Sequence, residues 1–368
     1  MHKGWFVLMG AVIGGGAMLL SYFGNPPNTG LCVSCFMENV SGAMGLHDNI
    51  RMQYLRPEIM GFVLGAFGLS LLRREFVPSG GSSPLLRFLI GFFLIVGCTI
   101  FIGCPVKMFL RLAGGDIGAL VGFFGLVVGI YIGLEFIENG FRLGRPMAQP
   151  KANSLFVPGL MILLLILAVI DPDFIARSEK GSGAMYAPLF LSLGVSVLIG
   201  ALAQYTQFCI TGGIARIFLW GPREVLNCPR STGLLISLIS FVGFAFVASF
   251  LTGQFHFGLT GQPSSNGSYG WAFLAMVMVG FGSVLIRGCP LRQLISASQG
   301  DNDAGAAVMG MFAGAAMAQN WNLAGNAAGT PPAGQVAVLL GLAIMFAVGV
   351  LNRRRGYGIA PEYQVGLD

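Results

Sequence analysis

Cysteine thiols are the groups in this sequence whose types and spacing point to chemistry. The chain of 368 residues has seven cysteines and only three histidines. Four of the cysteines fall in matched motifs: Gly103-Cys104-Pro105 matches Gly288-Cys289-Pro290, and Cys32 matches Cys209. A thiol is a weak hydrogen-bond donor and its sulfur a weak acceptor. Such groups suit a soft, polarisable sulfur or selenium atom better than a hard oxyanion.

The matched motifs belong to a longer internal repeat. Residues 97–116 read GCTIFIGCPVKMFLRLAGGD, and residues 282–301 read GSVLIRGCPLRQLISASQGD. At this shift of 185 residues, Lys107 pairs with Arg292. A weaker repeat, at a shift of 177, pairs Leu-Cys-Val-Ser at 31–34 with Phe-Cys-Ile-Thr at 208–211.

Each Gly-Cys-Pro motif predicts the start of a half-helix. Proline suits the first helical position, because it has no N–H to satisfy and its φ is already helical. Residues 105–114 would rise about 15 Å, half of a bilayer. Gly-Gly-Asp at 114–116 and Gly-Asp at 300–301 supply the stop and the next cap. The alternative is a pair of interfacial helices in ordinary loops.

A buried helix N-terminus offers free N–H groups and a partial positive charge, which attract anions. Cys104 and Cys289 are expected at these cap positions. Lys107 and Arg292 follow within the first turn and are expected to add positive charge. The alternative for these two cations is that they reach a lipid headgroup.

The other cysteines have simpler interpretations. Cys98 and Cys228 are expected to be small apolar residues, and the repeat partner of Cys98 is Ser283. Cys32 and Cys35 form a Cys-x-x-Cys pair, which is compatible with a disulfide, a redox pair or half of a metal site. A structural zinc site needs about four ligands, and no histidine has a helpful spacing. We therefore predict neither a metal nor another cofactor.

Composition assigns the chain to the membrane. Hydrophobic residues make up 55% of it and charged residues only 10%, with a mean hydropathy of +0.76. A spanning helix needs about 20 mostly apolar residues. Ten runs qualify, or nine if one short Gly-rich run does not span: 4–23, 57–73, 85–103, 116–137, 155–170, 186–203, 232–252, 270–287, 303–320 and 334–352. The predicted fold is an all-α polytopic membrane protein.

Each half is expected to hold about five spans, and an odd number inverts the second copy. Inverted repeats with broken helices near the midplane are typical of secondary transporters. The halves, 1–153 and 154–368, are predicted to form one transmembrane domain, with core repeats 4–137 and 186–320 and flanking helices 155–170 and 334–352.

The basic residues indicate topology. The net charge of +6 arises mainly from Arg and Lys in alternate loops, which places both termini in the cytoplasm and Cys32-x-x-Cys35 on the outer side. This placement argues against a nucleic-acid partner. Arg51 and Arg56 lie on the wrong side in this scheme. The residues that set it are Arg73, Arg74, Arg87, Arg142, Arg145, Lys151, Arg216, Arg223, Arg230, Arg353, Arg354 and Arg355.

No enzyme motif accompanies the thiols. The sequence has no phosphate-binding Gly-x-x-x-x-Gly-Lys-Ser/Thr loop, no Gly-x-Ser-x-Gly and no His-Glu-x-x-His. We therefore predict that it is not an enzyme. The competing hypothesis is a membrane thiol–disulfide oxidoreductase that uses Cys32 and Cys35. The absence of a second Cys-x-x-Cys counts against it.

The two Gly-Cys-Pro motifs, with Phe-Cys-Ile-Thr-Gly-Gly-Ile-Ala-Arg at 208–216, resemble the YeeE/YedE family of membrane proteins. The family includes thiosulfate uptake proteins. Asn-Pro-Pro-Asn-Thr-Gly-Leu-Cys-Val-Ser-Cys-Phe at 25–36 is most similar to the YedE branch, described as selenium transporters. The resemblance implies a bacterial inner membrane, a small inorganic sulfur or selenium substrate, and a cytoplasmic sulfur-carrier protein as partner.

The resemblance also implies pathway residues. Cys104 and Cys289 match the family's pathway cysteines, and a third is expected at Cys32 or Cys35. The extra cysteine departs from the family's pattern and puts strict thiosulfate specificity in doubt. We expect an anion to pass along protonated thiols by weak binding at several sites, which permits release as well as entry. The full predicted pathway comprises Cys32, Cys35, Cys104, Cys209, Cys289, Lys107 and Arg292.

Overall fold

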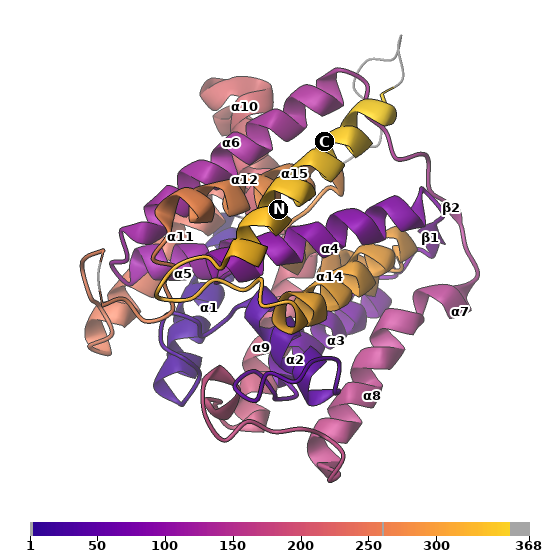
Figure 1. Cartoon of the computed structure of the whole chain (residues 1–368). Helices are drawn as coiled ribbons and strands as arrows, with labels where there is room; N and C mark the ends of the chain where they lie inside the picture. Colours follow the sequence, from indigo (N-terminus) through magenta and orange to yellow (C-terminus); the bar gives the residue numbers. More distant parts are fainter. Residues whose placement is uncertain (1–2, 260, 354–368) are drawn as a thin grey trace.

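The chain is built almost entirely from helices (Figure 1). A computed structural model describes residues 3–259 and 261–353. The helices of the first half are α1 (Lys3–Tyr22), α2 (Val33–Ala43), α3 (Pro57–Leu72), α4 (Pro84–Phe101), α5 (Pro105–Ala113), α6 (Gly118–Glu138) and α7 (Lys151–Ser154). Those that follow are α8 (Phe156–Ile170), α9 (Leu189–Thr206), α10 (Ile210–Asn227), α11 (Pro229–Leu251), α12 (Tyr269–Leu285), α13 (Pro290–Ser298), α14 (Asn302–Asn320) and α15 (Pro332–Leu351), with a 3₁₀ turn, η1 (Ser182–Ala184).

Seven helical stretches in the described part of the chain are long and apolar enough to cross a membrane. The protein is therefore a multi-pass membrane protein. Each of the ten predicted runs contains a helix. Of these, α3 and α8 have only 16 and 15 residues, and α14 is less apolar, with Asn, Asp and Gln among its 19 residues. The predicted nine or ten spans are thus confirmed as helices, but only seven of the stretches meet the length and hydropathy of a full span.

Helices α2 and α10 were not predicted, and neither was the four-residue helix α7. All 11 residues of α2 are buried, although the segment includes Glu38, Asn39 and two serines. Helix α10 bends at Gly221, where φ is +73°. Neither helix has a long apolar run, so hydropathy alone could not reveal them.

The two predicted halves interleave rather than form separate bundles. Helix α4 lies along α14 and α6 along α12, while α1 packs on α11 and α3 on α9 (Figure 1). The boundary at 153/154 falls within α7. Two short strands, β1 (Ser79–Gly80) and β2 (Met147–Ala148), form the only regular sheet described, pairing antiparallel with Ser79 opposite Ala148. The five cysteines of the predicted pathway are all buried in this interleaved core.

Glycines let these helices approach closely, as is common where helices pack in membranes. A Cβ added at Gly129 of α6 would lie 2.1 Å from the carbonyl oxygen of Val277 in α12. No heavy atom lies within 4 Å of the corresponding point at Gly194 of α9. The first glycine is therefore required by packing, and the second is not.

We expect Gly129→Ala to destabilise the protein by about 1–3 kcal/mol, because the two backbones must separate. Gly194→Ala should leave stability unchanged or raise it by up to about 1 kcal/mol, because alanine favours a helix over glycine. Thermal unfolding of both variants in the same detergent measures the difference. Equal melting temperatures would contradict the packing role of Gly129.

Arg56 has a structural role that explains its unexpected position in the charge pattern. It is fully buried, and its Nε donates to Asn39 Oδ1 at 2.7 Å while its guanidinium lies over the ring of Phe36. Its NH2 donates to the carbonyl oxygens of Ser182 and Met185. Arg56 therefore stabilises the position of α2 through these contacts. Because it is buried for this structural reason, it is not evidence for the side of the membrane on which its loop lies. Arg354 and Arg355 lie outside the described residues.

Candidate functional site: two thiol clusters

The first thiol cluster consists of Cys32, Cys35, Cys104 and Lys107. The Cys32 thiol donates to the sulfur of Cys35 at 2.8 Å and also lies beside Cys104. Lys107 Nζ lies 3.6 Å from the sulfur of Cys35. All four side chains are buried. The structure thus brings three thiols and one ammonium group together inside the protein.

The second thiol cluster consists of Cys209, Cys289 and Arg292. The thiols of Cys209 and Cys289 lie within hydrogen-bonding reach of each other. Arg292 lies close to both sulfurs and donates from its NH2 to Gln207 Oε1 at 2.5 Å. Gly212 stands where the first cluster has Cys35. The second cluster therefore has one thiol fewer.

All four repeat cysteines stand immediately before a helix. Cys32 caps α2 and Cys209 caps α10, and each sulfur accepts a backbone N–H three residues on, from Cys35 at 3.4 Å and from Gly212 at 3.3 Å. Each of these two sulfurs also lies 3.3 Å from a hydroxyl two residues on, that of Ser34 or Thr211.

The Gly-Cys-Pro cysteines occupy the same position at the other two helices. Cys104 and Cys289 precede Pro105 of α5 and Pro290 of α13, as predicted. Four helix N-termini therefore point positive partial charge at thiols.

The glycine of each Gly-Cys-Pro motif makes room for the cation. A Cβ at Gly103 would lie 2.9 Å from Cδ of Lys107, and one at Gly288 would lie 2.6 Å from Cγ of Arg292. The stem of each cation therefore folds back over the glycine. The residue before each glycine, Ile102 or Arg287, has a φ of +65°. This left-handed conformation is unusual for a β-branched residue such as Ile102 and turns the chain sharply after α4.

The stop and cap signals were predicted correctly in most respects. Helix α5 ends at Ala113, and Gly115 follows with a φ of +93°; α13 ends at Ser298, and Gly300 follows with a φ of +102°. Asp301 is the N-cap of α14 and accepts from two backbone N–H groups. Asp116 is not the N-cap residue of α6, because its carboxylate pairs with Arg111 at 2.7 Å while still accepting from Gly118 N–H.

The two cluster cations have no carboxylate partner among the described residues. Ion pairs there involve other cations, and neither Lys107 nor Arg292 lies within 4.0 Å of an acidic oxygen. The NH1 of Arg292 is buried with no hydrogen-bond partner in that part of the chain. A buried cation without an anion is costly. Each cluster therefore has a buried cation beside its thiols and no carboxylate within 4.0 Å of that cation.

A polar network beside the first cluster was missed in the sequence. Glu38 lies on α2, one turn beyond Cys35, and its carboxylate accepts from Gln319, whose Oε1 accepts from Asn49 Nδ2 at 2.7 Å. His47 donates from Nε2 to the Glu38 carbonyl oxygen at 2.9 Å, and burial lowers its pKa. The network leads from the buried carboxyl to the partly exposed Asn49 in the loop after α2. The one sequence signal for this network was an acidic residue, Glu38, three positions after the second cysteine of Cys32-x-x-Cys35.

The remaining two cysteines belong to neither cluster, although Cys98 lies near the first one, since its carbonyl oxygen accepts from Gly103 N–H at 2.8 Å. Cys98 is fully buried in α4, as expected of a small apolar residue, and Cys228 is partly exposed between α10 and α11. Within residues 3–259 and 261–353, no group of three or more His, Cys, Asp or Glu side chains is placed to hold a metal ion.

Comparison with known proteins does not assign the chain. No protein-family model matches it, and no curated protein matches its sequence. The function is therefore argued from the clusters themselves.

Proposed function

We propose that the protein is a transporter of a small sulfur- or selenium-containing anion, which passes along the thiols of the two clusters. The observation that carries this proposal is the pairing of buried thiols with a buried cation that has no carboxylate partner, at helix N-termini, once in each half of the chain. Positive charge attracts the anion, while weak thiol contacts suit its soft atom and allow release. Transport along cysteine thiols would make the chain a member of the YeeE/YedE family, which its two Gly-Cys-Pro motifs resemble.

We further propose that the halves form an inverted repeat with α5 and α13 as re-entrant half-helices. Several contacts support this. α6 packs on α12 as α14 packs on α4, and α1 packs on α11 as α9 packs on α3. Both α5 and α13 have nine residues, which rise about 14 Å, less than half of the hydrocarbon thickness. Nearly all of their side chains are buried.

The proposal includes a bacterial inner membrane with both termini in the cytoplasm. The bias of basic residues toward alternate loops supports this orientation. A cytoplasmic sulfur-carrier protein would accept the imported atom. Within this proposal the protein performs transport without catalysis.

Uptake into liposomes that contain the purified protein tests the function. Thiosulfate, selenite, sulfide and selenide would be compared with sulfate as the hard oxyanion. We expect uptake of at least one chalcogen anion above that of protein-free liposomes, and sulfate uptake at background. If none of the four exceeds the background in liposomes that contain folded protein, the proposal is wrong.

A thiol–disulfide oxidoreductase is the second candidate. The 2.8 Å contact between the sulfurs of Cys32 and Cys35 favours it, because two thiols already in contact can join without backbone movement. The second cluster has no equivalent of Cys35, so electrons would lack a second Cys-x-x-Cys pair as acceptor.

We expect a membrane-permeant oxidant to join Cys32 and Cys35 and to leave Cys98 reduced. Formation of this disulfide removes Cys32 from the proposed pathway, so uptake should fall and recover on reduction. Alkylation followed by peptide mass analysis detects the bond. Cys35→Ala is the control: whatever rate of uptake this variant has without oxidant, a Cys32–Cys35 bond cannot lower it. An oxidoreductase would instead cycle this pair during turnover with no uptake of any chalcogen anion.

A further inference from the structure

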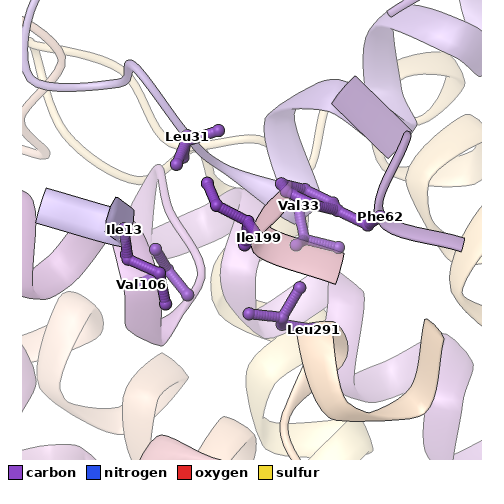
Figure 2. A pocket seen from close by; sticks show the side chains of 7 residues that line it. All are labelled: Ile13, Leu31, Val33, Phe62, Val106, Ile199 and Leu291. Atoms are coloured by element: carbon purple, nitrogen blue, oxygen red, sulfur yellow. The ribbon is translucent and has the colours of Figure 1, made fainter. Parts of the chain in front are cut away.

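An apolar cavity is lined by residues that lie one or two positions after cysteines of both thiol clusters. Its wall includes Val33, which follows Cys32, and Val106, which lies two residues after Cys104. On the other side it includes Leu291, two residues after Cys289. Figure 2 shows these side chains and that of Ile199 facing a common centre. A substrate that moves from one cluster to the other would pass this point.

The cavity is too small and too apolar to hold a hydrated ion. Its volume is about 10 Å³, near the minimum of about 10–15 Å³ that one water molecule needs. Its seven lining side chains are aliphatic or aromatic, with Ile13 of α1 and Phe62 of α3 among them. No side-chain donor in this wall can replace water around an anion. Hydrophobic constrictions of this kind close a pathway by excluding water.

Three of the seven lining residues, Val33, Val106 and Leu291, belong to helices that begin directly after a cluster cysteine. Val106 and Leu291 are each the second residue of their short helix, directly after the proline of Gly-Cys-Pro. Both are nearly fully buried. The element that places a thiol and a cation in each cluster therefore also places one aliphatic side chain between the clusters.

We propose that Val106 and Leu291 form an apolar gate that determines substrate specificity, rejecting strongly hydrated oxyanions and admitting anions that lead with a soft sulfur or selenium atom. This inference rests on the proposed transport function. An oxyanion such as sulfate must give up its hydrogen bonds to water on every face, and the apolar side chains of the cavity wall offer no hydrogen bonds to replace them. Thiosulfate presents one sulfur in place of an oxygen, which can enter the constriction first and meet the next thiol.

The test compares thiosulfate and sulfate uptake by liposomes that contain the full chain. The main variant combines Val106→Ser with Leu291→Ser, which brings hydroxyls and water into the gate. We expect sulfate uptake to rise at least about tenfold over the wild-type protein, because the barrier to the hydrated ion falls. Val106→Ala with Leu291→Ala is the second variant, for use if the serine pair does not fold, and it should raise sulfate uptake in the same direction.

Two matched controls separate the gate from general loosening. Leu291→Met keeps an apolar side chain of similar volume and should retain sulfate rejection. Leu294→Ala shortens a fully buried leucine of the same helix that does not line the cavity, and it should also retain rejection. Sulfate uptake that stays at background in a folded serine or alanine pair would overturn the gate.

The outcomes distinguish the gate from the transport function. If the wild-type protein carries no chalcogen anion but the serine pair leaks sulfate, Val106 and Leu291 form an apolar barrier to hydrated ions, while the proposed function and the admission of soft anions both fail. If the wild-type protein carries thiosulfate but the folded variants discriminate as it does, the function stands and the gate fails.

Discussion

Replacement of Cys289 by serine is expected to lower uptake of the chalcogen anion by about 10- to 100-fold, which corresponds to a loss of about 1.4–2.8 kcal/mol. Serine is nearly isosteric with cysteine, but its hydroxyl is a hard donor that no longer matches a soft atom. Cys289 also contacts Cys209, so a single change removes one member of a two-thiol cluster. Initial rates of uptake into liposomes, at equal protein content, measure the effect.

The chain supplies a matched control for this replacement. Cys98→Ser changes another fully buried cysteine, and the repeat already has serine at the equivalent position, Ser283. We expect uptake by Cys98→Ser to stay within about twofold of the wild-type rate, a difference of less than about 0.5 kcal/mol. Equal losses in the two variants would mean that buried thiols matter only for packing and would argue against the thiol pathway.

Arg111→Ala is expected to produce the largest loss of stability of any single change considered, about 3–5 kcal/mol. Arg111 Nε lies 2.7 Å from Asp116 Oδ2, and both side chains are almost fully buried. Arg111 also donates to the carbonyl oxygen of Phe101 at 3.1 Å and lies over its ring. Removal of the guanidinium leaves the carboxylate buried and uncompensated. Reversible unfolding in mixed micelles, or the melting temperature in one detergent, measures the loss.

Two further variants test whether the loss of stability in Arg111→Ala comes from the buried charge. Arg73→Ala breaks an exposed pair with Glu75, whose side chains are 43% and 39% accessible, and should cost no more than about 1 kcal/mol. Arg111→Met combined with Asp116→Asn removes both charges and keeps an acceptor for Gly118 N–H, so it should recover part of the loss. A double variant as unstable as Arg111→Ala would show that the Phe101 contacts, rather than the buried charge, account for the effect.

The sequence by itself determined most of the secondary structure and the ends of the short helices. Apolar runs identify helices without tertiary information, because a spanning helix must bury its backbone polar groups within its own length. Pro105, Pro290, Gly115 and Gly300 set starts and stops for local reasons of φ and missing N–H groups. The same local signals placed Cys104 and Cys289 at helix caps.

The tertiary structure alone decided which thiols meet. Cys32 and Cys104 lie 72 residues apart, and Cys209 and Cys289 lie 80 apart, so their contacts depend on how α2 packs near α5 and α10 near α13. The same holds for Glu38 and Arg56, whose partners come from α14 and from the segment around η1. Local sequence spacing cannot predict these long-range contacts, because they depend on how whole helices pack against one another. The proposed apolar gate could not be predicted from the sequence, since Val106 and Leu291 are ordinary aliphatic residues until the fold brings both into the wall of one cavity.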